Sequence, residues 1–303
     1  MLVIRECADE REEQLSLDVY NEAWPHEAVE LDIVHSYKAS LLDHADLLAH
    51  VDGEAAGSGF AALHPARPDL VTTMVIVRAE HRRRGAGTAL YQALSTWARE
   101  RGFETLETVV ADDDPEGRAF AERRGFEESR REPGLALDLT ATEPPPIEPP
   151  EGVEIVTWAE WPALIRGIYE VAVEALPDIP GGEEEIVEPF EDWLAHEMQG
   201  LGDRPDATFV AVADGEAVGY AKFSLGNLQR RTVFHDLTGV KRAWRGRGIA
   251  RALKSTQICW AKERGYEQLR TRNDDRNEPM RRLNTSLGYR PAVGRIYLLG
   301  PAA

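Results

Sequence analysis

Hydrophobic and polar positions alternate in short stretches of this chain and give way to helical spacing at regular intervals. The segments MLVIRE and GVEIVT alternate like strands, and each is followed by two acidic helical stretches. Asp52-Gly53 and Asp214-Gly215 then lie between apolar runs, which indicates a β-hairpin because both turn positions favour positive φ. A further strand, LVTTMVIV or TVFHDLTGV, leads into a turn rich in arginine and glycine and then into a helix.

The rest of each half repeats the same order. A fifth strand follows the helix, and we expect another helix ending at Gly125 or Gly288 and then a terminal hairpin. The predicted order is β-α-α-β-β-β-α-β-α-β-β in each half. This order is typical of an α/β (α+β) fold with a mixed, mostly antiparallel sheet flanked by helices.

The two halves are copies of one domain. HVDGEAAGSGFAAL aligns with VADGEAVGYAKFSL, and an offset of 163 residues separates both Arg82 from Arg245 and Gly125 from Gly288. Between the copies, TATEPPPIEPPEG has five prolines and no apolar periodicity, as in an extended linker. We therefore predict one domain at 1–140, a linker at 141–151 and a second domain at 152–303.

Composition narrows the function classes. An apolar content of 43% and a charged content of 29% are typical of a soluble globular protein. No apolar run approaches the roughly 20 residues that span a bilayer, and the N-terminus lacks signal-peptide features. A net charge of −18 argues against nucleic acid as a partner. Cys7 and Cys259 have no metal or redox spacing, so we expect a cytoplasmic protein without a metal site.

The arginine–glycine turn carries the strongest chemical signal. It reads HRRRGAGTAL in the first copy and WRGRGIARAL in the second, each between a strand and a helix. Glycines let the backbone approach a ligand, and the helix start directs free N–H groups and positive potential at one spot. Such a turn is an anion cradle suited to a pyrophosphate, whereas a Walker loop and G-x-G-x-x-G are both absent.

These two turns resemble the GNAT superfamily of acyl-CoA N-acyltransferases, whose signature is Gln/Arg-x-x-Gly-x-Gly/Ala after the fourth strand. The resemblance covers nearly the whole chain as a tandem pair, a layout like that of mycothiol synthase. It implies acetyl-CoA or coenzyme A as cofactor, with pyrophosphate on the loop amides and the pantetheine arm along the preceding strand. The cofactor-binding residues implied are Val77, Arg82, Arg83, Arg84, Gly85, Ala86, Gly87 and Thr88 in the first copy, and Val240, Lys241, Arg245, Gly246, Arg247, Gly248, Ile249, Ala250, Asn273, Asn277 and Asn284 in the second.

Acyl transfer to an amine needs a base, and the fourth strand of the second copy offers two candidates. On a regular strand Asp236, Thr238 and Val240 share one face, which makes Asp236 the main candidate. His235 lies on the other face unless a bulge intervenes. A structural or substrate-anchoring role for Asp236 is the alternative.

The first copy lacks this chemistry. Thr73 aligns with Asp236, and the first copy lacks the asparagines of the second. Many family members carry a tyrosine as thiolate acid where this chain has Asn284 or Ala121, so the acid is left open. We therefore expect catalysis in the second domain, and leave open whether the first binds coenzyme A or only completes the acceptor cleft.

The acceptor is expected to be a primary amine of a small molecule. The segment GGEEEIVEPFEDW at 181–193 could bind a cationic amine through its carboxylates, Phe190 and Trp193, or be a solvated acidic face. A non-catalytic acyl-CoA sensor, a protein or peptide acetyltransferase and an O-acyltransferase remain alternatives. Either a monomer or a homodimer is compatible with the sequence.

Overall fold

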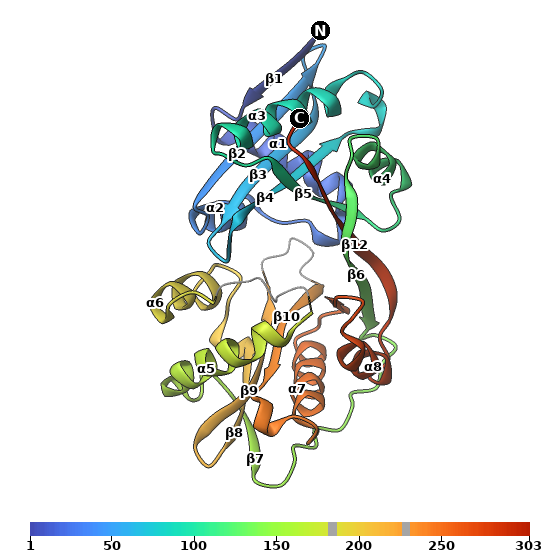
Figure 1. Ribbon diagram of the computed structural model, residues 1–303. Coiled ribbons are helices and arrows are strands. Elements are labelled where there is room, and N and C mark those ends of the chain that lie inside the picture. The colour runs from blue at the N-terminus through green and yellow to red at the C-terminus, as the bar shows by residue number, and fades with distance from the viewer. Residues whose placement is uncertain (181–186, 226–230) are drawn as a thin grey trace. The chain divides into compact units, whose positions relative to one another are not determined.

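The computed structural model describes residues 1–180, 187–225 and 231–303 (Figure 1). Within these ranges the chain forms two compact units, Met1–Arg131 with Arg295–Ala303, and Glu132–Gly294. Each unit has a mixed sheet flanked by helices, so the predicted fold class is confirmed.

The first unit follows the predicted order of elements as far as the helix before Gly125. Its strands lie in the order β1-β2-β3-β4-β5-β12, and every pair is antiparallel except β4 with β5. The elements are β1 (Leu2–Glu6), α1 (Glu10–Ala23), α2 (Leu31–Ala39), β2 (Asp43–Val51), β3 (Glu54–His64), β4 (Arg67–Val77), α3 (Ala86–Glu100), β5 (Thr105–Ala111), α4 (Pro115–Glu122) and β6 (Glu127–Asp138).

The second unit repeats this order. Its strands lie in the order β7-β8-β9-β10-β11-β6, and β10 with β11 is the parallel pair. The elements are β7 (Val153–Thr157), α5 (Ile165–Ala175), α6 (Phe190–Trp193) with a π-helical turn at Leu194–Met198, β8 (Thr208–Ala213), β9 (Glu216–Ser224), β10 (Thr232–Val240), α7 (Ile249–Glu263), β11 (Gln268–Arg272), α8 (Glu278–Ser286) and β12 (Arg290–Pro301).

The two predicted hairpins form at Asp-Gly tips. The φ angles are 55° and 91° at Asp52 and Gly53, and 51° and 81° at Asp214 and Gly215. Two consecutive positive φ values are the signature of the turn that matches strand twist, and they explain why Asp-Gly occupies both tips.

The prediction of a terminal hairpin in each copy is wrong. Each copy instead ends in one long strand that leaves its own unit. Residues Gly134–Asp138 of β6 pair with β11, and Arg295–Pro301 of β12 pair with β5. The compact units therefore differ from the ranges 1–140 and 152–303, because the last strands of the two copies are exchanged.

The exchanged segments carry core residues. Ile296 and Leu298 belong to the apolar cluster of the first unit together with Leu90, Leu94 and Leu106. In the second unit, α7 covers one face of the sheet and α5 covers the other, each over its own buried cluster. The sheet of the second unit is thus buried on both sides, which makes its central strands largely apolar.

Removing residues 295–303 is expected to destabilise the first unit selectively. The truncation would leave β5 without its antiparallel partner and remove the buried side chains of Ile296 and Leu298, each worth about 2–5 kcal/mol in a core. Hydrogen exchange should show lost protection in β5, while β7 and β8 keep theirs. Unchanged protection in β5 would contradict the assignment of this strand to the first core.

Candidate active site

Both arginine–glycine turns have the same backbone geometry. Gly85 and Gly248 precede α3 and α7 as their N-caps, with φ angles of 91° and 90°. Position 246 is glycine with φ 73°, whereas its counterpart in the first unit is Arg83 with φ 62°. A left-handed arginine is strained by about 1 kcal/mol, so glycine is the better fit at this position. In each turn the N–H groups at the helix start point toward one spot, as an anion cradle requires.

One arginine fixes each turn to the strand before it. Arg82 Nε donates to the Val77 carbonyl at 3.2 Å, and Arg245 Nε donates to the Val240 carbonyl at 2.9 Å. The remaining nitrogens bind carboxylates at 2.7 Å, Glu116 for Arg82 and Asp178 for Arg245. These arginines therefore hold the strand end and the turn in register in both copies.

Asp178 is the anionic partner of two guanidinium groups. It accepts hydrogen bonds from Arg242 and Arg245, which hold the pKa of its carboxyl well below the usual range. The ion pairs join α5's end to the turn before α7, so the turn is supported from the α5 side of the sheet.

A strand edge opens beside each turn. The parallel pairing of β4 with β5 covers only Val71–Thr73, and that of β10 with β11 covers only Thr232–Phe234. Beyond these points β5 and β11 follow the exchanged strands instead. Among the described residues, no strand pairs with Met74–Val77 or with His235–Val240 on that side, as expected for an edge that accepts an extended ligand.

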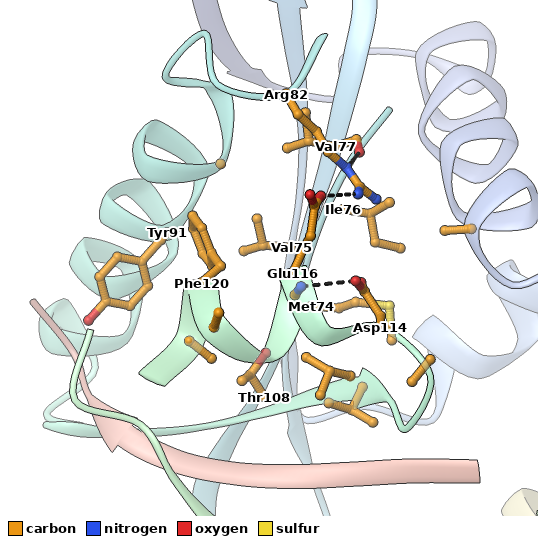
Figure 2. A pocket seen from close by; sticks show the side chains of 18 of the residues that line it. Met74, Val75, Ile76, Val77, Arg82, Tyr91, Thr108, Asp114, Glu116 and Phe120 are labelled. Carbon is orange, nitrogen blue, oxygen red and sulfur yellow. Dashed lines mark hydrogen bonds and ion pairs between the residues drawn. The ribbon is translucent and has the colours of Figure 1, made fainter. Parts of the chain in front are cut away.

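In the first unit this opening is a cleft of about 690 Å³. Figure 2 shows β4 at its floor, α3 with Tyr91 on one side, and α4 with Glu116 and Phe120 on the other. The turn residues Arg82, Arg83, Ala86 and Gly87 line its mouth. Glu116 reaches across the cleft to Arg82 (Figure 2), so the arginine at the mouth is already paired with a carboxylate.

The two fourth strands differ in register. β4 pairs with β3 without a break from Val71 to Val77, whereas β10 has a bulge between His235 and Thr238. The expectation that Asp236 shares a face with Thr238 and Val240 is therefore wrong. His235, Thr238 and Val240 pair with Phe223, Ala221 and Gly219, which places these three on the α7 face.

Asp236 lies on the α5 face, in a cluster around one buried lysine. Lys222 Nζ is 2.8 Å from Asp236, 2.9 Å from Asp203 and 3.9 Å from Glu197. Three carboxylates around one cation leave an excess of negative charge. Desolvation, with Asp236 and Asp203 nearby, raises the pKa of Glu197 to about 7. The side chains of Asp236 and Glu197 are partly exposed, so the cluster is open to a ligand.

Sequence reasoning missed Lys222 and Glu197. Lys222 lies in an apolar strand, where an isolated cation signals a buried ion pair, and Glu197 lies in an acidic segment where no single residue stands out. Only the fold brings β9, β10 and the π-helical turn together at this point.

His235 is part of a buried polar network. Its Nδ1 is 2.9 Å from Gln257 Oε1, and its Nε2 hydrogen-bonds the Tyr289 hydroxyl. Desolvation and the Lys254 charge hold the pKa of His235 well below its usual range. With both ring nitrogens engaged inside the protein, His235 has no nitrogen available to a substrate.

Lys254 of α7 lies beside this network and was not singled out from the sequence. Its side chain is 2% exposed, and its Nζ is 5.9 Å from the centre of the Tyr289 ring. Among the described residues, the Tyr289 ring is the contact that the structure shows for this ammonium group. Desolvation lowers the pKa of Lys254 to about 7.

The three asparagines take different positions. Asn284 is fully buried and donates to Asn273 Oδ1 at 2.7 Å, so it orients Asn273. The Oδ1 atom of Asn284 has no partner among the described residues. Asn277 caps α8 by accepting from the Met280 amide at 3.3 Å, a role that Asp114 performs for α4.

The expected acceptor segment is only partly described, because residues 181–186 lie outside the described ranges. The described part is less open than expected. Trp193 is buried in the α5 cluster, and Glu188 binds His196 at 3.0 Å. Trp193 therefore packs in the core and is not available to a cationic amine.

The cysteines carry no signal for chemistry. Both are free thiols, and desolvation raises the pKa of Cys7 to about 12 and also raises that of Cys259. Neither thiol is ionised near neutral pH, as a nucleophile would have to be. None of the helices in the described ranges is long and apolar enough to cross a membrane.

The acetyltransferase (GNAT) family model matches this chain twice, at residues 9–126 and 165–289. The chain belongs to the GNAT family. Its two matches include the two turns and the two short parallel strand pairs described above, and the chain is an N-acetyltransferase of tandem type.

Relatives of this GNAT protein are also acetyltransferases. The mycothiol acetyltransferase of Thermomonospora curvata is 30% identical over 84% of this chain and 82% of its own length. The L-2,4-diaminobutyric acid acetyltransferase of Nocardia farcinica is 39% identical over 26% of this chain and 44% of its own. A tandem GNAT protein of the clavulanic acid biosynthesis pathway has the same fold, with a TM-score of 0.76 at 21% identity over 100% of this chain and 99% of that one.

Replacing Lys254 by methionine is expected to flatten the pH dependence of stability. The folded pKa of about 7 lies below the unfolded value of about 10.4, so between them the unfolded state binds more protons. The free energy of unfolding should thus rise with pH by about 1.4 kcal/mol per unit over this window in the wild type, and less in Lys254→Met. Urea unfolding at several pH values measures both slopes, and equal slopes would contradict the buried amine.

Proposed function

We propose that this protein transfers an acetyl group from acetyl-CoA to a primary amine of a small molecule, and that the second unit performs the reaction. The bulge in β10 carries this proposal. The bulge supports the proposal because Thr238 and Val240 then share the face of His235, while Asp236 alone among these residues contacts the Lys222 cluster. Bulges are common beside active sites, and β4 has none at the equivalent position.

The second unit fits a coenzyme A thioester. Gly246 and Gly248 have open space where a Cβ would stand, and both have positive φ. The helix start after Gly248 offers N–H groups for a pyrophosphate, and Lys241, Arg245, Arg247, Ile249 and Ala250 surround it. The unpaired edge from His235 to Val240 offers hydrogen bonds to an extended pantetheine arm. Asn273, oriented by Asn284, and Asn277 add polar contacts.

Asp236 is the base that we propose for the acceptor amine. Its carboxylate lies on the face opposite the turn and remains partly exposed, so an amine can approach it from the α5 side. Lys222 holds it in place, and Glu197 adds a second carboxylate with a pKa near neutrality. The excess negative charge of the cluster favours a cationic amine, the form in which a primary amine arrives.

The first unit is proposed as a binding unit without acyl transfer. Its cleft and turn have the same construction, but β4 carries Thr73 at the place of Asp236, and that hydroxyl donates to the Glu107 carbonyl at 2.9 Å. The Glu116–Arg82 ion pair must open before an anion can use Arg82. We therefore expect the first cleft to bind coenzyme A more weakly than the second.

Gly248→Trp is expected to abolish the tighter binding of acetyl-CoA and all turnover, because the side chain would fill the cradle. Gly85→Trp should remove only the weaker site. Calorimetry with acetyl-CoA, and thiol release with L-2,4-diaminobutyrate in a panel of primary amines, measure these effects. Gly265→Trp and Gly102→Trp are matched controls, since both glycines have positive φ and open surroundings away from the turns. Loss of turnover in Gly85→Trp alone would assign catalysis to the first unit.

Asp236→Asn is expected to lower kcat by about 100-fold or more, the usual effect of losing a general base. The KM for acetyl-CoA should change little, because Asp236 lies on the face away from the turn. Glu197→Gln is the comparison, and Asp206→Asn, which breaks a surface ion pair with Arg204, is the control. A large loss in Glu197→Gln with near-normal Asp236→Asn would move the base to Glu197.

A further inference from the structure

The proposed reaction releases a thiolate, which must be protonated. The polar residues already considered for the site are unsuited to donate this proton. Asn284 has no acidic proton. Tyr289 is bound to His235, and desolvation raises the pKa of its hydroxyl well above the usual value. His235 is neutral and engaged on both nitrogens. The following inference rests on the proposed function and concerns the proton donor.

Lys254 is a buried cation without a recorded anionic partner in the described ranges. Burying an ammonium group costs free energy unless it is paired or discharged. The centre of the Tyr289 ring lies 5.9 Å from Lys254 Nζ. His235 is also near, since the charge of Lys254 lowers the pKa of that histidine. Lys222, the other buried lysine of this unit, differs because three carboxylates surround it. The Lys254 ammonium group is therefore suited to a site where a bound ligand supplies its polar partner.

By the internal repeat, Lys254 corresponds to a residue that lines the cleft of the first unit. Its counterpart in the first unit, at the 163-residue offset, is Tyr91, and the counterpart of Tyr289 is Phe126. The Tyr91 and Phe126 rings are in contact, with their centres 5.9 Å apart, and Lys254 Nζ likewise lies near the Tyr289 ring. Tyr91 and Phe126 both line the first cleft (Figure 2 labels Tyr91), and Tyr91 lies one turn of α3 beyond the mouth residue Gly87.

The depth of this position agrees with the reacting end of the ligand. Tyr91 lines the cleft together with Thr73, Leu106 and Thr108, where β4 and β5 begin to separate. In the second unit the corresponding point is the bulge that begins at His235. The side chain of Gln257, one turn of α7 after Lys254, hydrogen-bonds His235 there. An extended chain that enters at the cradle and follows the β10 edge ends at this point.

We propose that Lys254 donates the proton that the departing coenzyme A sulfur takes up. The amine nitrogen forms the new C–N bond, and the C–S bond breaks with its electron pair remaining on sulfur. The sulfur takes a proton from Lys254 Nζ, which becomes a neutral amine, while the proton lost by the amine nitrogen goes to Asp236. Water returns a proton to Lys254 after the products leave.

The electrostatics favour this direction of transfer. The titratable groups that face Lys254 are His235 from β10 and Tyr289 from the start of β12, both neutral near pH 7. Desolvation sets the pKa of Lys254 at about 7, below the value of about 8.5 for a thiol. A proton therefore moves downhill from the ammonium to the thiolate, and an acid with a pKa near the working pH is well matched to this task.

Kinetics separate a proton donor from a fixed charge. Lys254→Met should lower kcat by about 100-fold or more, with the KM for acetyl-CoA nearly unchanged, and should remove the fall of kcat with rising pH above about 7. Lys254→Arg should not restore kcat, because a guanidinium holds its proton. Lys262→Met, at the far end of α7, is the control. Rescue by arginine, or an unchanged pH profile in Lys254→Met, would overturn the proposal.

A binding measurement tests the same contact without an acceptor. Ultraviolet absorbance of the thiolate gives the pKa of the thiol of bound coenzyme A, which a neighbouring ammonium lowers. We expect that pKa to be higher in Lys254→Met than in the wild type by about one unit, and equal values would overturn the proposal. The first unit contributes equally to both proteins. If Lys254→Met fails to fold, Lys254→Gln takes its place.

These outcomes also separate this proposal from the proposed function. A wild type that binds acetyl-CoA and releases thiol with an amine, but whose Lys254 variants behave like the wild type, loses only the proton donor. A wild type that never releases thiol with any amine of the panel overturns the proposed function first.

Discussion

The architecture depends on one constraint, which is that backbone N–H and C=O groups inside a sheet must find partners. In each unit the parallel pair is joined over three residues and then separates. The second strand of each pair, β5 or β11, can separate from the first because the exchanged strand β12 or β6 pairs with it in antiparallel register. The first strand is left with an unsatisfied edge, and that edge is what a coenzyme A arm can occupy. The exchange of the last strands, the separation of the parallel strands and the edge left for a ligand thus depend on one another.

A few of the differences between the two copies decide their chemistry. One extra residue in β10 turns Thr238 and Val240 to the same face as His235, while Asp236 faces the Lys222 cluster on the other side. The regular β4 directs Thr73 into a hydrogen bond with its neighbour strand. Duplication has kept the cradle in both copies, because its geometry depends on local residues such as Gly85 and Gly248.

Local signals explain what the sequence could predict. Asp-Gly tips, the turns before α3 and α7 and the order of elements up to the terminal strand follow from neighbouring residues, and these appear in the structure. The exchange of β6 and β12 and the bulge depend on partners far along the chain, which periodicity does not contain. Lys254 escaped notice because a lysine in a helix is usually solvated. Its alignment with Tyr91, a largely apolar side chain, was the signal that could have found it.

The exchanged strand also sets the order in which the protein can mature during translation. The first unit includes Arg295–Ala303, so its sheet stays incomplete until the whole second copy has been synthesised. Domains usually fold one after another as they emerge from the ribosome, beginning with the N-terminal one. Here β5 of the N-terminal half has no β12 partner until residues 295–301 have been synthesised. Each sheet includes a strand from the other copy, so neither half of the sequence alone supplies all the strands of one unit.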